Sequence, residues 1–209
     1  MSDNSKNSGE TKLKQPLKQK LLPLILSVVA IVLDQITKAI VVKKIPVYNP
    51  FDPADGSVIP VIGDFLRFIH VKNNAVAFSI GHSLSQNIRT VLFAFLPLIV
   101  IVLVYFIYFR NNEFTKVQRW SICGILGGGL GNLIDRFFRP DGVVDFIDCA
   151  FWGNFFKKLG YKGSGILSWT RWPTFNIADS FVVVCGAIFL ISFIVLLVKE
   201  NKKNKKNKS

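Results

Sequence analysis

An uncharged apolar run at residues 90–109 constrains this chain more than any other feature of its sequence. Twenty helical residues rise about 30 Å, which matches the thickness of the hydrocarbon core of a bilayer. Residues 21–42, 117–134 and 177–198 are also largely apolar, and half of all residues are apolar. We therefore predict an all-α membrane protein, a bundle of four transmembrane helices that occupies residues 21–198 as one domain.

The third of these stretches is rich in glycine. Its glycines include two overlapping G-x-x-x-G spacings, Gly124/Gly128 and Gly127/Gly131. Such a cluster would indicate a loop in water, but in lipid it lets a neighbouring helix approach closely. Since apolar spans flank the stretch, we predict a tightly packed helix.

The first stretch has some features of a secretory signal. No small-residue cleavage pattern of the A-x-A kind follows it, and the chain continues through DQITK at residues 34–38 into more apolar sequence. We predict a retained membrane helix.

Both ends of the chain are basic. Residues 1–20 and 199–209 hold eleven lysines against three acids, out of a formal net charge of +13. They lack the interleaved aromatic residues of a nucleic-acid-binding face, so we predict disordered cytoplasmic tails and no nucleic-acid partner. Arg110, Lys116 and Arg119 crowd the link between the second and third spans, which the positive-inside rule also places in the cytoplasm.

This topology sends two long segments to the outer side, residues 43–89 and 135–176. The first carries turn residues followed by β-forming residues at 65–71, which predict a small β-rich element on the membrane. The second holds Trp152, Trp169 and Trp172, an aromatic content typical of the headgroup level.

Neither cysteine nor histidine indicates a metal or cofactor site. The spacing of Cys123, Cys149 and Cys185 fits neither a disulfide framework nor a zinc site, so we interpret them as small packing residues. His70 and His82 stand alone without the H-E-x-x-H spacing of a metalloprotease.

The candidate catalytic residues are aspartates at the ends of apolar segments. Asp145 follows an apolar stretch expected to return to the membrane surface, and Asp179 lies in the first turn of the last span. Either could be a turn or cap residue that complements a helix dipole. Together on one side of a small bundle they could share a proton and serve as general base and general acid. Asn132 and Asn176 are suited to orienting a peptide or a carboxylate.

Two other charged pairs have structural interpretations. Asp34 and Lys38 share one face of the first span at positions i and i+4, where a lysine partner explains a carboxylate in lipid better than catalysis does. Asp135 and Arg136 are adjacent charges at a helix exit, and the arginine could serve other carboxylates or lipid headgroups.

Five motifs occur in an order that resembles the lipoprotein signal peptidase (signal peptidase II) family. They run from the first span to the last: Asp34-x-x-x-Lys38, Asn73-x-x-x-Ala77-Phe78, Gly128-Gly129-x-x-Gly-Asn132-x-x-Asp135-Arg136, Val144-Asp145-Phe146 and Phe175-Asn176-x-Ala178-Asp179-Ser180. The resemblance implies an aspartic endopeptidase of the bacterial inner membrane, with its active site at the periplasmic face. It would cut diacylglyceryl-modified prolipoproteins just before the lipidated cysteine.

The resemblance also implies roles for particular residues. Asp145 and Asp179 match the two catalytic aspartates, and the supporting positions are Asn73, Asn132, Asp135, Arg136, Asn176, Asp34 and Lys38. The implied partners are the lipid bilayer and the prolipoprotein, with no cofactor and no obligate protein partner.

The sequence departs from the family pattern in two places. Ala75 stands where the family usually has glycine, which would strain the backbone if φ is positive there. An aromatic insertion at residues 151–174 separates the two aspartates, and it either shapes substrate access or is a neutral loop extension.

Two other functions use the same residues. A proton-coupled transporter could use Asp34, Asp135 and Asp179, although most polar motifs gather on one side. A Ser/Lys peptidase would need Ser180 near Lys38, and no motif links them.

Overall fold

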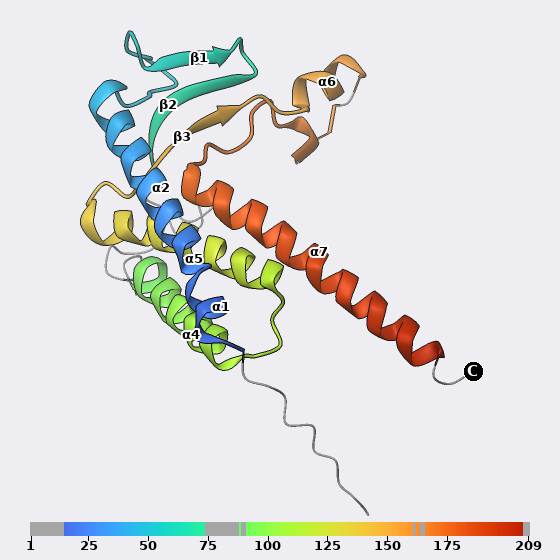
Figure 1. Ribbon diagram of the computed structural model, residues 1–209. Helices are drawn as coiled ribbons and strands as arrows, with labels where there is room; N and C mark the ends of the chain where they lie inside the picture. The colour runs from blue at the N-terminus through green and yellow to red at the C-terminus, as the bar shows by residue number, and fades with distance from the viewer. Residues whose placement is uncertain (1–14, 74–87, 89–90, 161, 164–165, 207–209) are drawn as a thin grey trace, which may run out of the picture.

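The computed structural model describes residues 15–73, 88, 91–160, 162–163 and 166–206, and its elements are drawn in Figure 1. The helices are α1 (Leu17–Leu21), α2 (Leu24–Lys44), the π-helical turn η2 (Val91–Phe95), α4 (Leu96–Arg110), α5 (Lys116–Phe138), α6 (Gly153–Lys158), the short 3-10 helix η3 (Ile166–Ser168) and α7 (Ile177–Lys206). Ala75, Ala77, Phe78, His82 and the first fourteen residues lie outside the described part.

Three of the four predicted spans are confirmed as helices long and apolar enough to cross a membrane. Within the described residues these are Leu17–Lys44, Leu92–Arg110 and Ile177–Lys206. The glycine-rich stretch at 117–134 is helical as predicted, inside α5, but it is not among the three. Its crossing of the membrane therefore stays a prediction.

The glycines of α5 let two helices approach it closely. A Cβ added at Gly127 would lie 2.6 Å from the Cα of Ser27 in α2, and one at Gly131 would lie 2.8 Å from the Asp34 carboxylate. A Cβ at Gly128 would overlap the Ala178 carbonyl at the start of α7. The Gly127/Gly131 pair therefore faces mainly α2, whereas Gly128 faces α7. Helices α2 and α7 both pack closely against α5.

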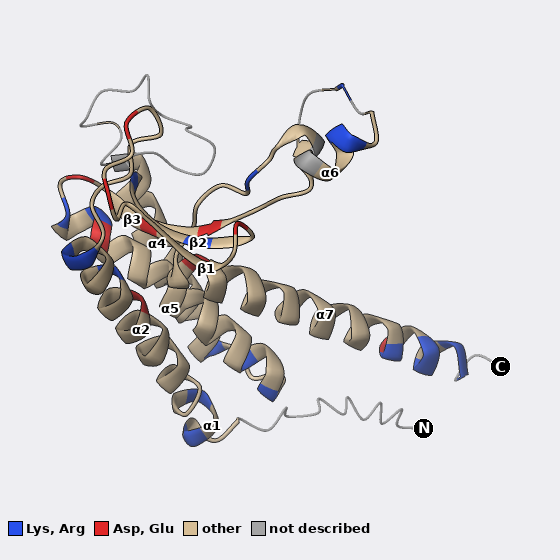
Figure 2. Ribbon diagram, turned by 90° about the horizontal axis from the view of Figure 1, so that it is seen from above, with Lys and Arg blue, Asp and Glu red and all other residues tan. Residues whose placement is uncertain are grey.

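The burial pattern of the helices is inverted relative to a water-soluble bundle. Asp34, Lys38 and Asp135 have no exposed surface, whereas many Val, Leu and Ile side chains of α2, α4 and α7 point outward. Figure 2 shows α7 without charge along most of its length and with basic residues gathered at its C-terminal end. This pattern suits helices surrounded by lipid.

A three-stranded antiparallel sheet lies at one end of the bundle, which we call the sheet end. It contains β1 (Val58–Ile62), β2 (Leu66–Asn73) and β3 (Val143–Cys149), in the order β1-β2-β3. The predicted β-rich element is confirmed by β1 and β2. The third strand was not predicted, because VVDFIDC is mostly buried and lacks the polar–apolar alternation that marks a half-exposed strand.

The aromatic insertion forms an arm, whose described residues are 151–160, 162–163 and 166–174. It leaves the end of β3, and its returning part pairs with its outgoing part, so that the Phe151 and Gly153 N–H groups donate to the Thr170 and Trp169 carbonyls. The Trp172 N–H donates to the Cys149 carbonyl, so the arm is continuous with the sheet.

Candidate active site

The start of α7 holds Asp179 through a reciprocal cap. Asn176 precedes the helix, and its side-chain oxygen accepts from the Asp179 N–H at 3.0 Å. The Asp179 carboxylate in turn accepts from the Asn176 N–H at 3.1 Å. This arrangement satisfies two backbone donors that the helix leaves free, and it fixes the Asp179 side chain at the helix entrance.

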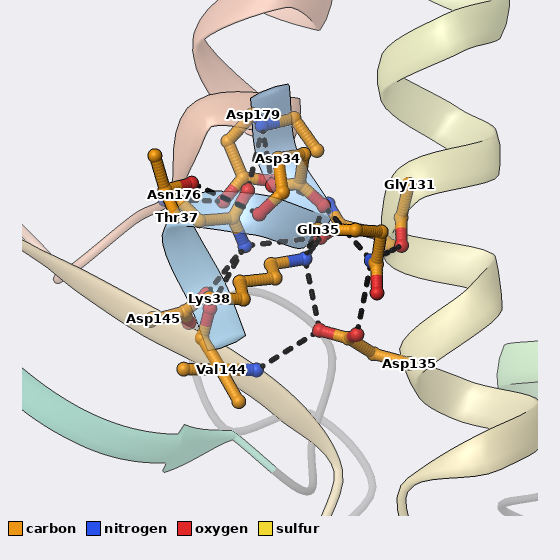
Figure 3. Close-up of polar contacts among 12 residues, drawn as sticks. Asp34, Gln35, Thr37, Lys38, Gly131, Asp135, Val144, Asp145, Asn176 and Asp179 are labelled. Atoms are coloured by element: carbon orange, nitrogen blue, oxygen red, sulfur yellow. Dashed lines mark hydrogen bonds and ion pairs between the residues drawn. The ribbon is translucent and has the colours of Figure 1, made fainter. Parts of the chain in front are cut away.

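Asp145 reaches the same place from the sheet. It lies in β3, is 3% exposed, and pairs across the sheet with Val71 of β2. One of its carboxylate oxygens accepts from the Asn73 amide at 2.8 Å. The other accepts from the Asn176 amide at 2.7 Å (Figure 3). Thus Asn176 contacts both aspartates.

A second asparagine closes this network from α5. The Asn132 amide donates to Asp179 at 2.7 Å, and its carbonyl oxygen accepts from Asn176 at 3.0 Å. The hydrogen-bond donors identified around Asp145 and Asp179 are therefore neutral amide groups. Such donors orient a carboxylate and leave it able to gain or lose a proton.

Burial, together with a smaller effect from the nearby charge of Asp179, raises the pKa of Asp145 to about 6. Hydrogen bonds from Asn73 and Asn176 and the charge of Lys38 act on this pKa in the opposite direction. A carboxyl group with a pKa near neutrality can both hold and release a proton at working pH.

A separate charged cluster lies beside this pair. The Lys38 ammonium lies 2.7 Å from an Asp34 oxygen and 2.9 Å from an Asp135 oxygen, and it donates to Asn132 at 3.0 Å. Arg139 pairs with the other Asp135 oxygen at 2.9 Å. The cluster thus joins two carboxylates to two cations, with no exposure at Asp34, Lys38 or Asp135.

The cluster also connects four elements of the fold. Asp34 accepts from the Ala178 N–H of α7 at 3.0 Å, and Asp135 accepts from the Val144 N–H of β3 at 3.2 Å. The interpretation of Asp34 as a structural partner of Lys38 is supported by this geometry. Asp34 lies at the level of the α7 entrance, so it belongs to the same group of acids as Asp179.

Arg136 lies near the acids of the site and against an aromatic ring. Its guanidinium carbon lies 5.6 Å from the centroid of the Phe93 ring, and it is close enough to Asp135, Asp145 and Asp179 to interact with their charges. It therefore contributes positive charge to the whole group of carboxylates, in addition to the ion pairs that Lys38 and Arg139 form with Asp135.

Sequence reasoning missed several contacts of the site. Arg139 follows Asp135 by four residues on one helix face, a spacing that could have suggested the ion pair. Gln35 donates to Asp34, Asp135 and the Gly131 carbonyl, and nothing in the local sequence predicts this. Asp148, 2% exposed, binds Arg67 and Arg171 at 2.6 Å each, a contact that depends on the unpredicted third strand.

Two cavities at the sheet end are separate from the aspartates. One of about 580 Å³ lies between β2 and the arm, lined in part by Arg67, Trp169 and Arg171, and one of about 480 Å³ is lined in part by His70 and Arg139. Neither lining includes Asp145 or Asp179. Across the described residues, no three His, Cys, Asp or Glu side chains are grouped to hold a metal ion.

A membrane-embedded helical protein with two carboxylates joined by asparagines at one end of its bundle belongs to the class of membrane hydrolases that work by acid–base chemistry. Residues 26–195 match the family model described as signal peptidase (SPase) II. The chain belongs to this family, which consists of membrane aspartic peptidases that remove signal peptides from prolipoproteins.

Similar proteins agree with this assignment. The chain is 45% identical over 183 residues to the lipoprotein signal peptidase of Treponema pallidum (strain Nichols), covering 88% of each protein. It is 44% identical to that of Treponema denticola, covering 88% of this chain and 95% of the relative.

Solved structures share the fold. Two bacterial membrane enzymes determined by the in meso method align with a TM-score of 0.61 each, at 23% and 26% identity. The first alignment covers 90% of this chain and 92% of that structure, and the second covers 82% and 92%.

The two alternative functions lose their support. The family assignment argues against a proton-coupled transporter. Contacts through Lys38 and Asn132 also connect Asp34, Asp135 and Asp179 in one group, whereas a transport pathway would place acids at several depths of the membrane. A Ser/Lys pair is also absent among the contacts of the described residues. Lys38 binds two carboxylates and Asn132, whereas the Ser180 hydroxyl donates to the Asn176 carbonyl.

Proposed function

We propose that Asp145 and Asp179 are the catalytic pair with which this chain cuts diacylglyceryl-modified prolipoproteins just before the lipidated cysteine. The observation that carries the proposal is the position of Asn176, which donates to the Asp145 carboxylate and caps the helix together with Asp179. Two acids held by neutral amides can share one proton, which an aspartic peptidase requires.

The geometry suggests how the bond is cleaved. Asp179 takes a proton from a water molecule whose oxygen attacks the carbonyl carbon of the residue before the cysteine. Asp145, whose pKa burial raises to about 6, donates its proton toward the substrate. The carbon–nitrogen bond of the resulting diol then breaks: Asp179 gives the proton that it took from water to the amide nitrogen of the cysteine, and Asp145 recovers a proton from a diol hydroxyl as the new carboxyl group forms.

The other matched residues position this pair. Asn73, Asn132 and Asn176 orient the carboxylates, and Asn132 connects them to Lys38. Asp34, Lys38 and Asp135 hold α2, α5, α7 and β3 in place. Arg136 neutralises part of the negative charge of the acids. The chain would act as one membrane domain, residues 21–198, without an obligate protein partner.

The orientation follows from charge. Lys18 and Lys20 of α1, the α4–α5 link and the lysines in the last turn of α7 lie away from the sheet, and we assign that end of the bundle to the cytoplasm (Figure 1). The sheet and the aspartates then lie at the periplasmic face of the inner membrane. A substrate with two acyl chains can reach them laterally through the bilayer.

The test is cleavage of a lipidated prolipoprotein by Asp145→Asn and Asp179→Asn variants. We expect each to lose at least about 10³-fold in rate at unchanged thermal stability, because an amide cannot exchange the catalytic proton. Asp141→Asn is the matched control, since that side chain is 63% exposed and pairs with Lys72. Full cleavage by either aspartate variant excludes the proposed pair.

A further inference from the structure

The arm at residues 151–174 has a composition unlike the rest of the sheet end. It carries four cations, Lys157, Lys158, Lys162 and Arg171, and the sequence has no acid between residues 149 and 178. By contrast, β3 and the residues before β2 contain Asp64, Asp145 and Asp148. The arm is therefore a local concentration of positive charge beside an acidic site.

Its short helix is amphipathic. Around α6, Phe155, Phe156 and Leu159 follow Trp152 by three, four and seven residues, which places all four on one side of the helix. Lys157 and Lys158 fall on the opposite side at about 100° per residue. A helix with aromatic residues on one side and lysines on the other is typical of elements that lie in the plane of a membrane interface.

Most of the apolar side of this helix is exposed in the part of the chain that the structure describes. Trp152 is 61% exposed, Phe155 is 53% exposed and Leu159 is 68% exposed. Ile166 and Trp172, on the returning part of the arm, are also exposed. In a water-soluble domain such a helix would bury its apolar side, so another phase or molecule covers it here.

The base of the arm is packed closely and tied to the sheet. A Cβ added at Gly153 would overlap the Trp169 carbonyl, which shows how closely the two parts of the arm pack. Asp148 binds Arg171 of the arm and Arg67 of β2, which ties the arm to the sheet. In both ribbon views α6 projects away from the helical body (Figures 1 and 2).

We infer that the arm is a membrane-surface binding element that inserts Trp152, Phe155 and Leu159 below the headgroups of the leaflet at the sheet end and binds anionic phospholipid headgroups with Lys157 and Lys158. Continuity supports lipid as the occupant, because the arm leads directly into α7, whose residues 177–206 include a membrane span. Charge supports anionic lipid, since the arm contains three lysines and no acid, whereas its one arginine, Arg171, is paired with Asp148. Tryptophan is also enriched at this depth of a bilayer.

The test uses the full chain in nanodiscs of phosphatidylcholine and phosphatidylglycerol, with bromine on the upper acyl carbons of one lipid at a time. The fluorescence of Trp152 is obtained as the difference between the chain and its Trp152→Phe variant. We expect quenching by either brominated lipid, and stronger quenching when the bromine is on phosphatidylglycerol. The enrichment of that lipid should be about fivefold and should fall with salt.

Charge reversal separates headgroup binding from simple insertion. Lys157→Glu/Lys158→Glu should abolish the preference for phosphatidylglycerol, whereas Lys205→Glu/Lys206→Glu, the same change at the far end of α7, should leave it intact. Absence of quenching, together with free access of aqueous iodide to Trp152, would overturn the inference, because Trp152 would then lie in water and not in lipid. Equal quenching by both lipids, unaffected by the lysine changes, would overturn the claim that Lys157 and Lys158 bind anionic headgroups. The readout needs no peptide cleavage, so it is independent of the proposed catalytic pair.

Discussion

The charged cluster of Asp34, Lys38 and Asp135 and the proposed catalytic pair of Asp145 and Asp179 contain the same kind of acid in adjoining positions. The first two carboxylates are fully buried and share a lysine. The other two are held by asparagine amides. An ion pair between a buried carboxylate and a lysine fixes both side chains and joins the elements that carry them, whereas neutral amide donors orient a carboxylate without neutralising its charge. The aspartates that share a lysine therefore have a structural role, and we propose the catalytic role for the two held by asparagine amides.

The largest effect should come from removing the cation of the charged cluster. Lys38→Met leaves two buried carboxylates without their shared lysine, and we expect a loss of roughly 3–5 kcal/mol in the free energy of unfolding. Unfolding of the protein in mixed micelles by a denaturing detergent measures this. Lys72→Met is the matched control, because the Lys72–Asp141 pair is exposed and should contribute less than about 1 kcal/mol. Equal losses from both variants would show that the buried cluster contributes no more to stability than an exposed ion pair.

The second prediction concerns a glycine that lets α2, which carries Asp34 and Lys38, pack closely against α5. Gly127→Ala places a methyl group against the Ser27 backbone and should destabilise the protein by about 1–3 kcal/mol by forcing α2 away from α5. Gly186→Ala in α7 meets no atom within 4 Å and should leave stability unchanged or slightly higher. The same detergent titration applies, and a destabilised Gly186→Ala variant would show that the cost is not steric.

The third prediction concerns Asn132, which connects the regions. Asn132→Ala removes the donor to Asp179 and the acceptor for Lys38. Hydrogen bonds to charged groups contribute about 1.5–3 kcal/mol, so kcat should fall by roughly tenfold to a hundredfold while KM changes little. Steady-state kinetics on a lipidated precursor separates the two constants. If only KM rises, Asn132 binds substrate and does not position Asp179.

The smallest effect is a shift in pH dependence. A carboxyl group that must be protonated, with a pKa of about 6, predicts that kcat/KM falls as pH rises through 6. The Asn73 hydrogen bond favours the ionised form of Asp145, so Asn73→Ala should raise that pKa and move the fall to higher pH by about 0.5–1 unit. Asn49→Ala, at a position outside the site, should not move the profile. An unshifted profile for Asn73→Ala would mean that another group carries the proton.

Much of the helical framework was predictable from local sequence. The long apolar runs predicted three helices that the structure contains, and the glycine spacing predicted the helical form of α5. These predictions succeed because length, hydropathy and residue size act within one segment. The strand β3 and the arm were harder, since a strand buried on both faces has no alternating pattern and the arm depends on pairing between distant residues.

The sequence by itself determined the family and the candidate residues for the chemistry, because an aspartate in apolar sequence is costly and its occurrence in ordered motifs is specific. The tertiary structure alone decided which groups each aspartate contacts. The close packing of α2 and α7 on α5 brings Lys38 to Asp34 and Asp135, and the sheet delivers Asp145 to Asn176. Charge neutralisation acts over a few ångströms between segments that lie far apart in the sequence, a distance that only the fold sets.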